Sequence, residues 1–451
     1  MTLALLVAGV LLAQPLPAQR APAVPGAAPD TTVADADSLS SATARTAPPP
    51  DSERASGPAS LDAPRLPRAQ PDSGAAPIEL RPRLAPASLF STSRGFGIAG
   101  GVGIRNLGFE GSDVVLDAYL AQRYQGARIS AYTDPPYASN LYGFVSVGAS
   151  TTTRRRFYGL GATSREENQL FLDYASMDAE TRVGAYPLGN TGLFLQPGAR
   201  LLWDRLSDVE EAELGALDRI TEADRQAIVS VRDDSRYGVS LGLQVASDLR
   251  DWRAYPRKGT FVSVEARRFY ALDGSDLRFN RFGFSSLGYL PIRGRTALIG
   301  RTNLVLTRSD GDAPIPFYYL PSLDSRLLTA YAPDRFVGRD VLAFVGGIRV
   351  PIADFIGVYG VDMALLGYMG NAYDNVFDQV KAGVSFDSER LRPDEDGRIS
   401  FRPALGLGIG IVNLDKERVV VGGLIGVGPE GISLATLRVA YDLRDSRPLF
   451  R

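Results

Sequence analysis

The chemistry open to this chain is limited first by two residue types that it lacks. Its 451 residues include no cysteine and no histidine. Without cysteine there is no disulfide, thiolate nucleophile or thiolate metal ligand. Without histidine there is no Ser-His-Asp triad and no imidazole metal site. Carboxylate pairs and oxygen-coordinated Ca²⁺ or Mg²⁺ remain open, but the composition favours a protein that is not an enzyme, with no catalytic residue.

Two short motifs resemble binding loops, and neither predicts a cofactor or a metal site. Residues 426–431 fit the pattern GxGxxG, which binds dinucleotides only between a strand and a helix. A strand pattern follows here and Pro429 sits within the motif, so we expect a hairpin turn. Residues 394–397 resemble part of a calcium loop, but Arg392 occupies the first ligand position. The net charge of −2 gives no reason to expect a nucleic-acid partner.

The elements that carry these residues follow a sharp break in composition. Fifteen of the 30 prolines lie in residues 1–86, and Phe90 is the first aromatic residue. Residues 3–13 form an apolar run that is too short to span a bilayer, which needs about 20 residues. With Ala18 behind it, the run predicts a signal peptide over residues 1–18. Residues 19–85 are rich in Pro, Ala and Ser, and they predict a disordered linker.

Residues 86–451 alternate apolar and polar side chains with period two, as in the segment 239–246. This pattern is typical of a soluble antiparallel sheet or of a membrane barrel with an apolar outer face. The segments are longer than the usual five to six residues or so of a strand, and their polar face is rich in Arg, Asp and Gln. Short and long connections also alternate. The sequence therefore predicts an all-β fold, a transmembrane antiparallel β-barrel of about 16 strands.

One long connection shows a different pattern. In 206–233, two sequences that resemble capping boxes occur among apolar residues at helical spacing, which include Leu206 and Val209. We expect one or two short helices on an external loop.

Four segments follow one another along the chain: RRRFYGLG (154–161), DLRDWRAYPRKG (248–259), RFVGRDVLAFVGGIRVPI (335–352) and YGVDMALLG (359–367). Together they resemble the barrel of the BamA/TamA outer-membrane assembly superfamily, also called the bacterial surface antigen family. The resemblance covers about residues 85–451. Full-length members carry POTRA domains, for which residues 19–85 are too rich in proline. The chain resembles a barrel-only member.

The resemblance implies a location in the bacterial outer membrane, with the linker in the periplasm, and a part in inserting or translocating proteins or lipids there. The implied partners are outer-membrane lipid, unfolded outer-membrane proteins and other assembly components. A weak seam between the first and last strands would admit an incoming strand. Glycines such as Gly95, Gly97, Gly422 and Gly423 fit such a seam, although close packing of the barrel explains them as well. The alternative function is a passive pore or a structural barrel without assembly activity.

The resemblance also implies a long loop folded into the barrel, whose Arg-Gly-aromatic tip pairs with an aspartate on the wall. The matching loop is 309–335, with the tip Leu328, Thr329, Ala330 and Tyr331. Thr329 and Ala330 replace the Arg-Gly pair. Asp362 falls where the wall aspartate would be, and Arg326 or Arg335 could pair with it in the lumen. The alternative is that all three are ordinary solvated charges.

Overall fold

A computed structural model describes most of the chain between Ile78 and Val439. The described residues are 78–83, 87–91, 95–107, 112–133, 141–162, 164, 169–187, 192–209, 224, 228, 235–251, 255–323, 328–332, 334–386, 392–414 and 418–439. The chain divides into two compact units, Met1–Arg65 and Leu66–Arg451, and the first lies outside the described residues. So does the predicted signal peptide (1–18), and so does the predicted linker (19–85) up to residue 77.

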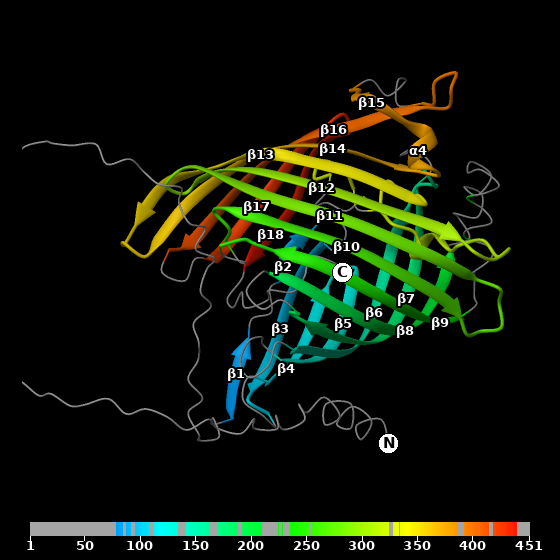
Figure 1. Cartoon of the computed structure of the whole chain (residues 1–451), viewed down its shortest axis with the longest axis horizontal. Helices are drawn as coiled ribbons and strands as arrows, with labels where there is room; N and C mark the ends of the chain where they lie inside the picture. The colour runs from blue at the N-terminus through cyan, green and yellow to red at the C-terminus, as the bar shows by residue number, and fades with distance from the viewer. Residues whose placement is uncertain are drawn as a thin grey trace, which may run out of the picture. The chain divides into compact units, whose positions relative to one another are not determined.

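The described part of the second unit is mainly antiparallel sheet (Figure 1). Its elements in chain order are β1 (Glu79–Arg83), β2 (Ala87–Ser91), β3 (Gly95–Arg105), β4 (Ser112–Ala121), β5 (Tyr124–Thr133), β6 (Leu141–Phe157), β7 (Leu170–Ala185), β8 (Leu193–Val209), β9 (Ser235–Asp248), β10 (Gly259–Ala271), β11 (Arg278–Arg293), β12 (Thr296–Ser309), η4 (Phe317–Tyr319), β13 (Asp340–Phe355), β14 (Tyr359–Tyr373), α4 (Val376–Gln379), β15 (Val380–Val384), β16 (Ile399–Asn413), β17 (Arg418–Gly428) and β18 (Gly431–Val439).

Sixteen of these strands form a closed ring. Each strand from β2 to β14 pairs antiparallel with the next, β14 pairs with β16, and β16 to β18 continue the series. The ring closes where β18 pairs with β2, while β15 lies outside it and pairs in parallel with β16. The predicted antiparallel barrel of about 16 strands is confirmed.

Among the described residues, the ring is least continuous on the two sides of β2, which pairs with β3 at two positions and with β18 at three. β18 and β2 are in register at three positions, with Leu437, Arg438 and Val439 opposite Phe90, Ser88 and Ala87. By comparison, β6 and β7 are in register from Leu141–Ala185 to Phe157–Leu170. β1 and β2 follow one another along the same partner, β3. We call the β18–β2 junction the seam.

The paired part of the chain begins earlier than the sequence indicated. β1 (Glu79–Arg83) lies inside the predicted linker, 19–85, yet it pairs with β3 from Arg105 to Gly101. Its proline and its charges resemble a linker in composition. Proline is nevertheless tolerated at the edges and ends of sheets, so composition alone did not reveal this strand.

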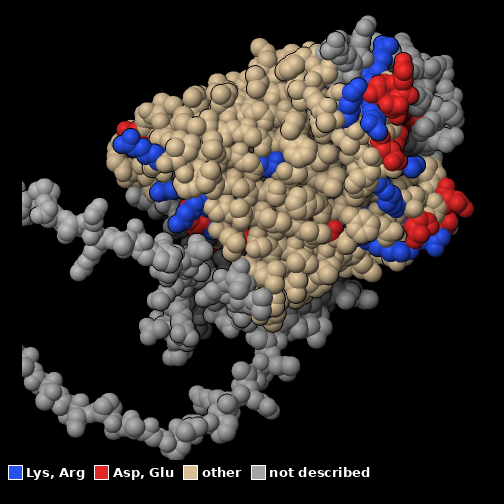
Figure 2. All heavy atoms as spheres, turned by 45° about the horizontal axis from the view of Figure 1, so that its top comes forward, with Lys and Arg blue, Asp and Glu red and all other residues tan. Residues whose placement is uncertain are grey.

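Burial alternates in the opposite sense to that of a soluble sheet. In β9, Leu241 is 50% exposed and Leu243 is 47% exposed, whereas Gln244 is only 5% exposed. Large apolar side chains on most other ring strands are exposed too, among them Ile98, Leu116, Met177, Val264, Phe282, Leu365 and Ile409. Figure 2 shows charged side chains gathered at the two ends of one face, with a broad band between them that is almost free of charge. An apolar outer face over a polar interior is the pattern of a barrel in lipid.

The longest connections share one end of the barrel. Residues 158–169, 210–234, 310–339 and 374–398 join strands that leave the sheet in the same direction, while the opposite end has the tight turns 294–295 and 356–358. The expectation of helices in 206–233 was wrong at its start, because Leu206 and Val209 belong to β8. Asp224 and Ile228 are helical, and the other residues of 210–234 lie outside the described part. No helix among the described residues is long and apolar enough to cross a membrane.

Candidate functional site

The connection between β12 and β13, residues 310–339, contacts the inner side of the barrel wall. Its first anchor is the short helix η4. The Phe317 ring packs 4.7 Å from the ring of Phe157, measured between centroids. The Tyr319 hydroxyl donates to Asp204 on β8 at 2.7 Å, and Arg281 on β11 donates to the Tyr319 carbonyl. Burial, together with Asp204, raises the pKa of Tyr319 well above its ordinary value, so its hydroxyl remains a donor.

The predicted tip lies against the wall beside the seam. Leu328, Thr329, Ala330 and Tyr331 are all buried. The Tyr331 hydroxyl donates to the carbonyl of Pro403 on β16 at 3.1 Å, and burial keeps this phenol protonated by raising its pKa. On β17, a Cβ atom at Gly426 would come within 2.6 Å of the tip backbone at Thr329 and Ala330. The glycine therefore makes room for the tip.

Arg335 holds the returning arm of the loop to two other connections. Its guanidinium donates to both carboxylate oxygens of Glu430, at 3.0 and 3.3 Å, in the turn between β17 and β18. It also donates to the hydroxyl and the carbonyl of Ser164, at 2.8 and 3.0 Å. The Arg335 side chain is 4% exposed, and it lies over the ring of Tyr158. One buried arginine thus ties loop 310–339 to the last hairpin of the ring and to loop 158–169.

Asp362 and Arg335 have different partners. Asp362 lies near the turn 356–358, where it accepts hydrogen bonds from Tyr255 and from Arg295, the latter at 3.3 Å. Arg349 approaches it at 3.9 Å. The other predicted partner, Arg326, lies outside the described residues. The structure therefore brings Arg335 together with Glu430 and not with Asp362.

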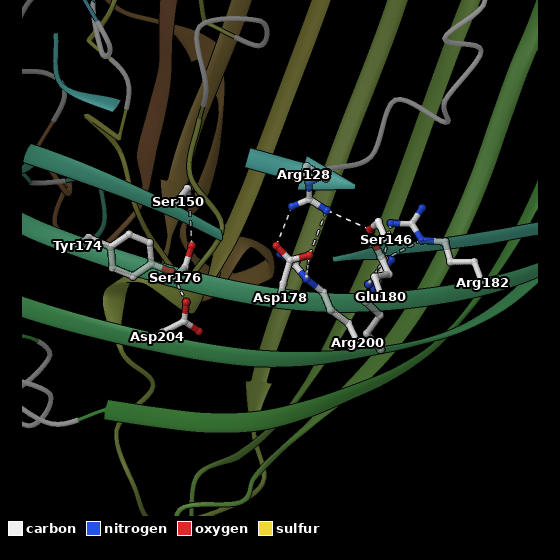
Figure 3. Close-up of polar contacts among 11 residues, drawn as sticks. Arg128, Ser146, Ser150, Tyr174, Ser176, Asp178, Glu180, Arg182, Arg200 and Asp204 are labelled. Carbon is white, nitrogen blue, oxygen red and sulfur yellow. Dashed lines mark hydrogen bonds and ion pairs between the residues drawn. The ribbon is translucent and has the colours of Figure 1, made fainter. Parts of the chain in front are cut away.

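The wall on the other side of the lumen carries a network of ion pairs (Figure 3). Arg128 on β5 reaches across β6 and donates to both oxygens of Asp178 on β7, at 2.6 and 3.1 Å. Arg200 on β8 approaches the same carboxylate at 3.6 Å. Arg182 pairs with Glu180 at 2.6 Å. These charges are largely enclosed in the lumen, where pairs between arginines and carboxylates satisfy them.

In sequence, the chain matches no family model and no curated protein. In structure, it is similar to BamA from Haemophilus ducreyi lacking POTRA domains 1-3, with a TM-score of 0.55 over 77% of this chain and 67% of that one, at 14% identity. The fold is that of the BamA barrel. The resemblance predicted from the sequence is confirmed at the level of fold.

Two further solved structures overlap this BamA-type barrel less well. CdiB from Acinetobacter baumannii is 12% identical, with a TM-score of 0.44 over 78% of this chain and 58% of that one. CdiB from Escherichia coli is 10% identical, with a TM-score of 0.48 over 79% of this chain and 61% of that one. This chain thus spans about three fifths of the CdiB chains.

Sequence reasoning missed two features of this BamA-type barrel. Glu430 belongs to the Gly426–Gly431 motif, which forms the β17–β18 hairpin as predicted. An acidic residue in this turn was the available signal for an ion pair with an arginine. Tyr255 lies in the segment 248–259, which supported the resemblance without a role for the tyrosine. Among the described residues, no group of three or more acidic side chains could hold a metal ion.

Proposed function

We propose that this chain is an outer-membrane β-barrel that takes part in inserting or translocating proteins, or lipids, at that membrane. The observation that carries the proposal is the seam, where the described residues of β18 and β2 are in register at three positions. Strand edges with few partners are sites where another strand can pair. An incoming strand could therefore join the sheet there at a small loss of existing pairing.

The loop tip adds a way to regulate the seam. Tyr331 is bonded to β16, Gly426 of β17 makes room for the tip, and Glu430 binds Arg335. All three contacts hold the strands that lead into β18. The loop would support these strands in the closed state, and its release would make the seam easier to open.

The same features support the proposed location and partners. The apolar outer face fits outer-membrane lipid. Unfolded outer-membrane proteins and other assembly components would meet the barrel at the seam. The role is mechanical, so we propose no enzymatic activity for this chain.

A disulfide across the seam tests the proposal. The chain has no cysteine, so Ser88→Cys with Arg438→Cys introduces two thiols on residues that face each other across β2 and β18. Oxidation should abolish assembly of a second barrel protein in proteoliposomes, and reduction should restore it. The matched control joins Ala179→Cys and Leu201→Cys, which are partners on β7 and β8. Full activity with a seam shown to be crosslinked would refute the proposal.

A passive pore is the second candidate, and the charged lumen wall around Arg128 and Asp178 favours it because a water-filled channel needs polar walls. Steady conductance in planar bilayers, together with unchanged assembly of other barrels after depletion and add-back, would select the pore.

A further inference from the structure

At the end of the barrel opposite loop 310–339, part of a turn also enters the lumen. β9 ends at Asp248 and β10 begins at Gly259. Of the residues between them, Tyr255 is only 2% exposed and Pro256 is also buried. Turns at the end of a barrel usually lie in solvent. The burial of Tyr255 and Pro256 therefore shows that this turn packs against other parts of the barrel. We call residues 255–258 the strap.

The strap is held by strands that are not its neighbours. The Tyr255 hydroxyl donates to Asp362 on β14. The guanidinium of Arg349 on β13 lies 3.9 Å from the centre of the Tyr255 ring and donates to the Pro256 carbonyl at 2.5 Å. With neighbouring strands about 4.8 Å apart, β14 lies about 19 Å along the wall from β10. The strap therefore crosses the lumenal side of β11 and β12.

The strap is fixed at its base and held by side chains at its tip. At the base, Asp251 accepts hydrogen bonds from the amides of Arg257 and Lys258, at 2.9 and 3.2 Å. Gly259 has a φ of 98°, and a Cβ atom there would come 2.2 Å from the Leu249 carbonyl. At the tip, Asp362 on β14 and Arg349 on β13 hold Tyr255 and Pro256. Such a segment can swing away when those contacts break.

We propose that the strap is an autoinhibitory closure of the lumen, held shut by Asp362 and Arg349 at the end that would face the periplasm. A solute or an unfolded chain that enters the lumen from that end along β11 to β14 would have to displace Tyr255. This inference concerns the lumen and not the seam. Its readouts do not depend on assembly activity, so it can fail while the proposed function stands.

Accessibility of the strap tests the inference in the full chain. Pro256→Cys gives a single thiol beneath the Arg349 contact, and its carbonyl is retained. In this background, Tyr255→Phe removes only the hydroxyl that binds the Asp362 carboxylate. Because a hydrogen bond to a charged group contributes a factor of about ten or more, labelling of the thiol by a small hydrophilic reagent should become about tenfold faster. Tyr237→Phe is the matched control, since Tyr237 is half-exposed on β9.

A second variant protects the test against misfolding. Asp362→Asn keeps the size of the side chain and should also accelerate labelling, and unchanged heat-modifiability on gels would show that both variants fold. In planar bilayers both should raise the open-channel frequency above that of the parent. Labelling rates equal to that of the parent in both folded variants would overturn the proposal that Asp362 holds the strap in place. Faster labelling with unchanged conductance would show that the strap moves without closing the lumen, which also overturns the proposal.

Discussion

The seam and the wall from β5 to β8 are built from the same kind of strand but are held in different ways. At the seam, β18 meets β2 at three positions, and the adjoining strands β16 and β17 are supported from inside by a loop. On the wall from β5 to β8, β6 and β7 are paired along their length apart from one irregularity between Thr152 and Arg155, and Arg128 connects β5 to β7 by side chains alone. The barrel therefore has one stiff side and one side where movement requires the loss of few contacts.

The largest effect should come from the stiff wall. Asp178→Ala leaves Arg128 without its main partner in the lumen, and removing one member of such a pair costs about 3 kcal/mol in unfolding free energy. Denaturant unfolding in detergent would measure the loss. Asp312→Ala, at an exposed loop position, is the control and should be neutral. A loss of unfolding free energy no larger than that of Asp312→Ala would show that the wall does not depend on this pair.

A slightly smaller effect is expected beside the seam. Gly426→Val places a side chain where the tip backbone already lies, 2.6 Å from a Cβ position, and overpacking of this kind costs about 2 kcal/mol. The tip should detach and become accessible to protease. Gly300→Val on β12 is the matched control, because nothing lies within 4 Å of its Cβ position. Equal protease resistance in the two variants would contradict the proposed cradle.

The ion pair between the loop and the last hairpin should contribute less. Glu430→Gln keeps the shape of the side chain but removes the charge opposite Arg335, and the pair is partly exposed on its glutamate side. We expect the unfolding free energy to fall by about 1 kcal/mol, since Arg335 retains its hydrogen bonds to Ser164. Hydrogen exchange should increase in β17 and β18 but not in β6 and β7. Equal increases in all four strands would indicate general destabilisation instead.

The smallest effect lies outside both regions. In the connection 374–398, the Lys381 ammonium, 2.8 Å away, holds the pKa of Asp394 below its usual value. A carboxyl group with a depressed folded pKa stabilises above its unfolded pKa, near 4, and loses this contribution as pH falls through the folded value. The protection factor of the Arg398 amide, which donates to Asp394, should therefore fall in acid. In Lys381→Gln this fall should begin at a higher pH, with the seam unchanged.

Much of the fold could be predicted from the sequence because alternation is a local property. Strands such as β9 show their two faces in eight consecutive residues, and the strand count follows from repeating that pattern. The start of β1 could not be predicted, since its composition resembles the linker before it. The end of β8 was mistaken for a helix because Leu206 and Val209 are three residues apart, a spacing that places two side chains on one face of a helix.

The residues of the candidate site could be located from the sequence, but their partners could not be predicted. The loop, its tip and Asp362 were all identified from motifs, yet the partner of an ion pair depends on how deep the loop sits. Tyr368, which packs with the tip residues, lies six residues beyond Asp362 on β14, or about 20 Å along the strand. At that distance Arg335 meets Glu430 and Asp362 meets Tyr255. How deep the loop sits in the barrel cannot be read from a pattern of residue types.

The arginines of the stiff wall have a further consequence for how the barrel folds. Arg128, Arg182 and Arg267 each face a glycine on the neighbouring strand: Gly148, Gly198 and Gly242. A Cβ atom at Gly148 would lie 2.9 Å from the Arg128 guanidinium, and two residues to either side stand Ser146 and Ser150. A slip of β6 by one pleat repeat would keep every side chain on its proper face and satisfy the hydrophobic pattern. It would nevertheless place a serine against the Arg128 guanidinium, where only glycine leaves room. The pairs of arginine and glycine therefore select one strand register among those that the hydrophobic pattern allows.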